Sequence, residues 1–118
     1  MNLFLKTTVL IALLHSSGSW ANSGAWLTGD ELLRTCQGSD DSYKQGMCAG
    51  YILGAADATT IWELWQDLSS NICISSDVKI GTVIDAVVAH MNAHPHELHF
   101  DAGSIVLNAL IKRYPCRE

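Results

Sequence analysis

Residues 42–69, SYKQGMCAGYILGAADATTIWELWQDLS, form the longest helical pattern in the chain and decide its fold class. A capping box at Ser42 to Gln45 predicts where this helix begins. Thr59, Glu63 and Asp67 share one face of the helix, where we expect them to be solvated. Apolar side chains recur at steps of three and four residues on the opposite face: Met47, Tyr51, Ala55, Ala58, Trp62, Trp65 and Leu68.

Three glycines at four-residue spacing, Gly46, Gly50 and Gly54, flank this apolar face. A glycine inside a helix costs about 1 kcal/mol relative to alanine, so three of them suggest the close approach of another backbone. The alternative is glycine tolerated as filler. We expect the face formed by Gly50, Gly54, Asp57 and Leu64 to pack either against another helix of the same chain or against a second copy of it.

Shorter helical patterns lie on either side of the long one. A capping box at Thr28 opens a short helix that ends near Cys36. A third pattern runs from about Gly81 to His94, and a fourth follows at once and ends at Pro115. The sequence therefore predicts an all-α fold, a small disulfide-linked bundle of about four helices with one long central helix.

The first residues follow the order of a bacterial secretory signal peptide. Lys6 precedes an apolar run to Leu14, and small residues lead to Ala21. We expect cleavage after Ala21, so that residues 1–21 are a signal peptide and residues 22–118 form one exported, periplasmic domain. An uncleaved membrane anchor is the alternative, but the run is shorter than the ~20 apolar residues that span a bilayer.

The chain contains four cysteines, Cys36, Cys48, Cys73 and Cys116. An even number of cysteines in an exported domain predicts disulfides. A zinc site is the rival, but no close Cys-x-x-Cys pair is present. Antiparallel packing brings the end of the first helix to the start of the second, and the end of the second to the end of the last, which predicts the pairs Cys36–Cys48 and Cys73–Cys116.

Four histidines surround Pro95: His90, His94, His96 and His99. His90 and His94 have the spacing of a zinc-binding pair, but Met91 stands where a zinc protease has its glutamate. We expect a solvated corner between the last two helices. A metal site and a pH-responsive surface are the alternatives.

Several function classes find no support in the sequence. The formal net charge of −5 does not favour nucleic-acid binding, which needs clustered Lys and Arg. The chain has no Gly-x-Ser-x-Gly elbow and no phosphate-binding glycine loop, and disulfide formation leaves no free thiol. We therefore expect a binding protein that is not an enzyme, without cofactor or metal and without membrane association.

Four motifs together resemble the Rap/Tai family of type VI secretion amidase immunity proteins. They are Leu-Leu-x-x-Cys ending at Cys36, Cys-x-Gly-Tyr-Ile-x-Gly-x-x-Asp at residues 48–57, His94-Pro95, and Tyr-Pro-Cys ending at Cys116. The resemblance covers nearly all of the mature chain. Where family members often have Cys-x-Pro, this chain has Cys-Ile-Ser at residues 73–75.

This resemblance implies a small helical periplasmic protein, often a homodimer, that acts in interbacterial competition. It would bind a peptidoglycan amidase delivered by a neighbouring cell and occlude the active-site cleft. We favour residues 71–77 as the blocking loop, with the histidine corner as second choice. The candidate contacts in this loop are Asn71, Ser75, Ser76 and Asp77.

Two other functions remain open at this stage. A periplasmic acid-stress chaperone is also small, helical and disulfide-linked, and it would expose apolar surface near pH ~4 as carboxylates become protonated. A structural protein of an envelope complex would instead have a stable partner that is not an amidase.

Overall fold

Four α-helices and one short 3-10 helix make up the part of the chain that the structure, a computed structural model, describes: residues 26–38 and 40–117. No strand occurs within these residues. The expected signal peptide lies outside them. The all-α prediction is confirmed, and the helices are α2 (Gly29–Cys36), α3 (Ser42–Trp65), α4 (Ile80–Ala93) and α5 (Ala102–Arg113), with the 3-10 helix η1 (Pro95–Glu97) between the last two.

Helix α3 is the long central helix, with 24 residues, but both of its ends differ from the expectation. Its N-cap is Asp41, whose Oδ1 accepts hydrogen bonds from the backbone N–H groups of Tyr43 and Lys44 at 3.0 and 3.2 Å. Asp41 therefore caps this helix in place of the expected Ser42 box. The helix ends at Trp65, several residues early, and Asp67 has a positive φ of 53° just beyond it.

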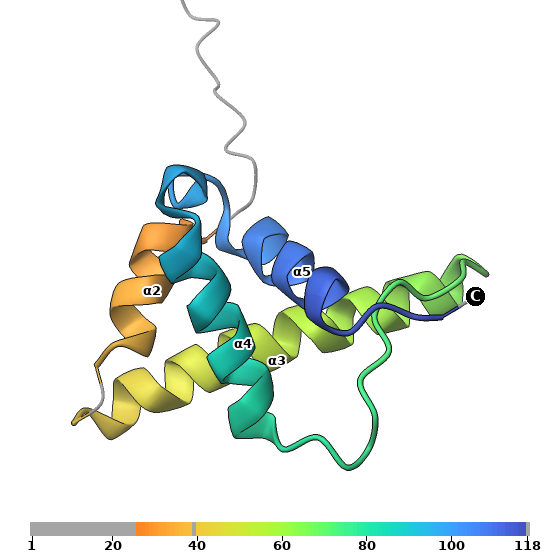
Figure 1. Cartoon of the computed structure of the whole chain (residues 1–118), viewed down its shortest axis with the longest axis horizontal. Helices are drawn as coiled ribbons and strands as arrows, with labels where there is room; N and C mark the ends of the chain where they lie inside the picture. The colour runs from red at the N-terminus through yellow and green to blue at the C-terminus, as the bar shows by residue number, and fades with distance from the viewer. Residues whose placement is uncertain (1–25, 39, 118) are drawn as a thin grey trace, which may run out of the picture.

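Helices α2, α4 and α5 lie together on one side of α3, and the C-terminal end of α3 extends beyond α5 (Figure 1). The core between them is formed mainly by aliphatic side chains that are fully buried. These are Leu32, Ile52, Val87, Met91, Ile105, Val106 and Leu110. Burial of each such side chain contributes about 1.5–3 kcal/mol, so this small core supplies most of the driving force for folding.

Only part of the apolar stripe that the periodicity places on α3 packs against the core. Cys48 and Ile52 are buried, and Tyr51 and Ala55 are partly buried. Trp62, by contrast, is 58% exposed. The reason is that apolar residues occupy both faces of α3, and the packing of the other helices selects the Cys48 and Ile52 face. Trp65 and Leu68, which belong to the same predicted stripe, are exposed as well.

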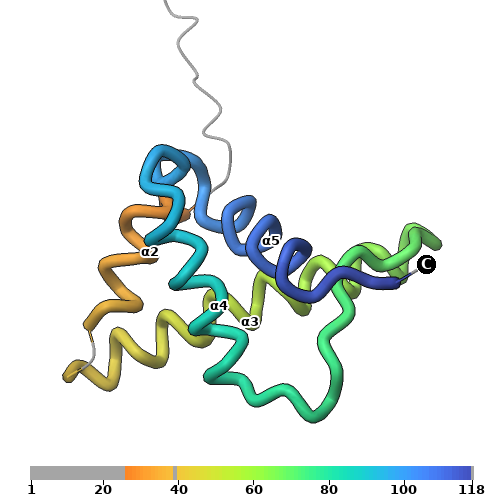
Figure 2. The backbone as a smooth tube through the Cα atoms, viewed as in Figure 1, coloured from red at the N-terminus to blue at the C-terminus, as the bar shows by residue number. Residues whose placement is uncertain are grey.

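Two disulfides join the helices in the predicted pairs. Cys36–Cys48 links the end of α2 to α3, and Cys73–Cys116 links the connection after α3 to the C-terminal tail. This connection doubles back beside the tail and then swings outward before α4 begins (Figure 2). The backbone N–H of Cys73 donates to the carbonyl of Tyr114 at 2.8 Å, so the disulfide and this bond fix the two segments together.

Side chains cap α2 and α5 as well. The predicted capping box of α2 is present: Thr28 accepts from the backbone N–H of Glu31, whose carboxylate accepts from the backbone N–H of Thr28. Asp101 caps α5 by accepting from the backbone N–H of Ser104 at 2.8 Å. Among the described residues, we find no helix with the length and apolarity that crossing a membrane requires.

Candidate partner-binding site

The connection from α3 to α4 carries the four residues predicted to contact a partner, Asn71, Ser75, Ser76 and Asp77, and all four are exposed. Ser75 donates a hydrogen bond to the carboxylate of Asp77, which is the main reason that the pKa of Asp77 lies below its ordinary value. The backbone N–H of Val78 donates to the carbonyl of Ser75 at 3.0 Å. The tip of the connection is thus exposed and also held by local bonds.

The base of this connection is fixed to the helical body at two points. On one side, the Cys73–Cys116 disulfide and the bond from Cys73 to Tyr114 hold it against the C-terminal tail. On the other side, the side-chain amide of Asn71 donates to Oε1 of Glu63 in α3 at 3.3 Å. Glu63 is 8% exposed, which corrects the expectation that it is solvated.

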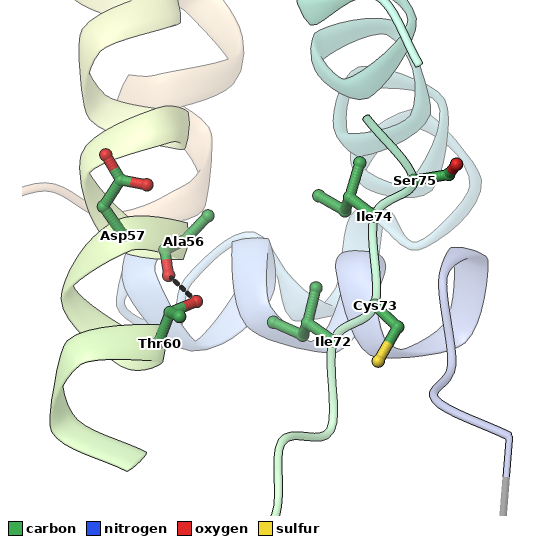
Figure 3. Close-up of a pocket in the computed structure, with 7 residues that line it drawn as sticks. All are labelled: Ala56, Asp57, Thr60, Ile72, Cys73, Ile74 and Ser75. Carbon is green, nitrogen blue, oxygen red and sulfur yellow. Dashed lines mark hydrogen bonds between the residues drawn. The ribbon is translucent and has the colours of Figure 1, made fainter. Parts of the chain in front are cut away.

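A groove of about 560 Å³ lies between α3 and the extended residues 72–75. Figure 3 shows the side chains of Ile72 and Ile74 on the side toward α3, and those of Cys73 and Ser75 on the side away from it. The lining residues are Ala56, Asp57, Thr60, Ile72, Cys73, Ile74 and Ser75. The sequence did not predict that Ile72 and Ile74 would face α3 across a groove. The alternation Ile-Cys-Ile does indicate an extended chain, in which both isoleucines point to the same side.

The outward face of α3 carries a second apolar stripe, which we call the α3 seam. Its members recur at alternating steps of four and three residues, the spacing of a coiled-coil contact line. All are exposed and lie on the side of α3 opposite Ile52. They are Tyr43, Met47, Gly50, Gly54, Ile61 and Leu64, together with the charged Asp57.

The seam contains the predicted packing face, Gly50, Gly54, Asp57 and Leu64. A Cβ atom built on Gly50 or Gly54 would meet no heavy atom within 4 Å, and the same holds at Gly46. No described segment of the chain therefore packs against these glycines, and packing by another helix of the same chain is wrong for the described residues. A second copy of the chain stays a prediction.

The histidines lie at the expected corner, where α4 ends at Ala93 and η1 follows. His90 Nε2 lies 3.2 Å from Oε2 of Glu97, and the rings of His90 and His94 stack with centroids 4.1 Å apart. The His90 side chain is only 8% exposed, so this corner is less solvated than expected. Within residues 26–38 and 40–117, no three His, Cys, Asp or Glu side chains are grouped so that they could hold a metal ion.

Glu97 has a lowered pKa at this corner. Burial alone would raise it, but the hydrogen bond from His90 and the positive charges of His94, His90 and Lys112 outweigh that effect. The ionised carboxylate is therefore stabilised in the folded protein, and it holds η1 against α4. The corner lies at the other end of the molecule from the end of α3 (Figure 1).

The described surface thus brings together the 71–77 connection, the groove and the end of α3. Large apolar side chains are exposed at that end, with Leu64 and Trp65 each 75% exposed. Clusters of exposed apolar side chains commonly mark sites of protein association. No catalytic arrangement was predicted from the sequence, and the surface has the character of a binding site.

Two comparisons with known proteins bear on this site. The model of a family described as Rap1a immunity proteins matches residues 28–116, which include all four helices, both disulfides and the 71–77 connection. No curated protein matches the chain.

Proposed function

The chain belongs to the family of Rap1a immunity proteins, and from this premise we propose that it inhibits a peptidoglycan amidase delivered by a type VI secretion system. An immunity protein has a cognate secreted effector as its partner. The identification of that effector as an amidase extends the motif resemblance of residues 48–57 and of the Tyr-Pro-Cys tail. The protein would act by binding alone.

One observation supports binding through the end of α3. Residues 71–77 form a largely exposed loop that the Cys73–Cys116 disulfide holds near the end of α3, where Trp62 and Trp65 are exposed. A loop that is already ordered loses little conformational entropy on binding, so it can enter a cleft at low cost. The apolar side chains beside it provide area that a partner can bury. We propose that the loop occludes the cleft while these side chains hold the amidase.

Two disulfides support a periplasmic location, because such bonds form and persist in oxidising compartments. We propose that export depends on residues 1–21 as a cleaved signal peptide. The amidase would then be met where its substrate is, outside the inner membrane.

We also propose that two copies pair through the α3 seam. In an antiparallel pair centred between Gly54 and Asp57, Gly50 lies opposite the second copy's Ile61, and Met47 lies opposite the second copy's Leu64. Small residues then face large ones, and the two glycines allow close approach of the backbones. The seam would be buried by self-association and the 71–77 loop would remain accessible.

The test of inhibition is binding of the oxidised protein to a candidate amidase encoded beside its gene, scored together with peptidoglycan cleavage. Ser76→Arg places a bulky charge on the loop, and Asn108→Arg places the same charge on an exposed position of α5. We expect wild type and Asn108→Arg to bind and abolish cleavage, and Ser76→Arg to lose inhibition. Absence of both binding and inhibition in the wild type would remove the assignment.

A further inference from the structure

We infer that the groove between α3 and residues 72–75 receives an extended segment of the effector, with a Lys or Arg of that segment placed against Asp57. The inference rests on the proposed function, since the effector is the partner that supplies the segment. It adds a second, receptive site to the blocking loop: the loop enters the effector, and the groove takes a segment from it. Asp57 also belongs to the α3 seam, so the segment binds the single chain, and self-association through the seam competes with it.

The backbone of residues 72–75 has one paired edge and one open edge. Cys73 donates to Tyr114, and an isolated antiparallel bridge joins Ile72 to Pro115, so the C-terminal tail occupies one edge. Backbone groups of successive residues in an extended chain point to opposite edges, which turns Ile74 to the other side. The N–H and C=O groups of Ile74 make no hydrogen bond with any described residue.

An open edge of this kind is suited to strand addition, in which an extended peptide pairs with exposed backbone groups and its side chains enter neighbouring pockets. Four extended residues span about 13 Å at ~3.3 Å each, so the edge matches three or four residues of a partner. The groove volume of about 560 Å³ leaves room for their side chains.

The groove offers apolar contact from both of its sides. Ile72 and Ile74 contribute side chains from the connection, and Ala56 lies across from them on α3. All three are only partly buried, so apolar area is still accessible to solvent. An apolar side chain of the bound segment would cover this area, at about 25 cal/mol for each Å² removed from water.

Asp57 gives the groove its charge preference. Its carboxylate is exposed, and it forms no ion pair or hydrogen bond with any described residue. It is the only ionisable residue among those that line the groove, apart from the disulfide-bonded Cys73. A Lys or Arg of the partner would supply the missing countercharge, and partial burial beside Ile74 would strengthen the pair relative to one in open water.

A small molecule fits the groove less well than a peptide does. None of the seven lining residues is buried, so no enclosed polar group is present to orient a compact ligand. An open backbone edge, apolar side chains on both sides and a single carboxylate instead border one groove, and an extended peptide can contact all of them.

The experiment measures the affinity of the oxidised protein for the candidate amidase of the inhibition test, with two matched pairs of variants. Asp57→Lys reverses the groove charge, and Asp85→Lys makes the same change on an exposed position of α4. Ile74→Lys places a charge in the apolar wall of the groove. Ile111→Lys makes the same substitution at an exposed position of α5, away from the groove. Sedimentation at the same concentrations reports whether Asp57→Lys also changes self-association. Hydrogen exchange of the Ile74 amide is measured with and without amidase.

We expect both groove variants to bind about tenfold or more weakly, a loss of the size of one well-placed contact, while the two controls bind like wild type. The Ile74 amide should exchange more slowly in the complex. If wild type binds and inhibits but the groove variants bind equally well, or the Ile74 amide gains no protection, the inference is overturned and the proposed function stands. If wild type itself neither binds nor inhibits, the proposed function falls, and this inference falls with it.

Discussion

The side-chain amide of Asn71 donates a hydrogen bond to Oε1 of Glu63 over 3.3 Å, and this contact joins the loop base to the body of α3. Glu63 is the one charged residue that is buried among the described residues. A buried carboxylate needs hydrogen-bond partners, because desolvation without them is costly. The loop base must therefore stay in place for the buried Glu63 carboxylate to keep its hydrogen bond from Asn71.

Replacement of Asn71 by alanine is expected to lower the free energy of unfolding by about 1–3 kcal/mol, the range for leaving a buried polar group unpaired. Combining Asn71→Ala with Glu63→Leu should recover part of that loss, since no carboxylate then remains buried. Urea unfolding of the single and double variants measures both effects. Ser76→Ala, at an exposed loop position, is the control and should stay within about 0.5 kcal/mol of wild type. Equal stability of Asn71→Ala and wild type would contradict the coupling.

Removing either disulfide is expected to lower stability, but only removal of Cys73–Cys116 is expected to weaken effector binding as well. In the loop-entropy model, Cys36–Cys48 and Cys73–Cys116, with sequence separations of 12 and 43, contribute about 3 and about 4 kcal/mol. Replacing either pair by serine should destabilise the fold. Only loss of Cys73–Cys116 should also weaken effector binding beyond the loss of folded protein, because that bond holds the loop and the groove. Unfolding curves and affinities measured on both variants, below their unfolding transitions, check this difference.

Stability is expected to fall on acidification in part through Glu97. Its pKa in the folded protein lies below the ordinary value of 4.5. The unfolded state therefore takes up a proton first as pH falls, so the stabilisation is fully present above that value and is lost toward the lower folded pKa. Glu97→Gln should be less stable than wild type at pH ~7, and the difference should shrink between about pH 5 and pH 3.

Urea unfolding at a series of pH values measures that difference, with Asp85→Asn as a control at an exposed carboxylate. A constant gap between wild type and Glu97→Gln across the series would contradict the role of the His90 contact. Apolar-dye binding in the same titration tests the acid-stress alternative. That function requires dye binding to rise sharply near pH ~4 while helical structure is retained.

Local signals in the sequence were enough for much of the fold. The capping box of Thr28 and Glu31 depends on residues three apart, and it forms as predicted. The pairing of Cys73 with Cys116 followed from antiparallel order alone, because only one arrangement of ends brings them together. Helix order and disulfide pairs were therefore predictable from spacing.

Spacing alone could not predict which face of α3 is buried, or that a groove forms beside it. Periodicity finds an apolar face, but α3 has two, and the choice between them depends on which helices pack where. Glu63 is buried through a partner that lies outside its helix, so its own helical position gave no sign of it. The groove is lined by Asp57 and Ile74, which belong to different elements and are brought to the same groove only by the return of the chain beside α3.

The α3 seam gives a prediction in which monomer stability and self-association change in opposite directions. A Cβ atom at Gly54 meets nothing within 4 Å in the single chain, so Gly54→Ala should stabilise the helix by about 1 kcal/mol. In a pair of seams the same methyl group lies between the two backbones and should weaken the dimer. Gly81→Ala is the matched control, since Gly81 in α4 is equally open but lies outside the seam.

Sedimentation equilibrium and urea unfolding at low protein concentration measure the two effects separately. We expect both alanine variants to gain stability as single chains and only Gly54→Ala to dissociate more readily. Ile61→Asp, which places a charge in the seam, should give a monomer that keeps its helices, because the Ile61 side chain is already exposed. A dimer unaffected by both Gly54→Ala and Ile61→Asp would mean that another surface joins the copies. A wild type that is monomeric at all concentrations would mean that the seam faces a different partner, because its apolar side chains would still be uncovered.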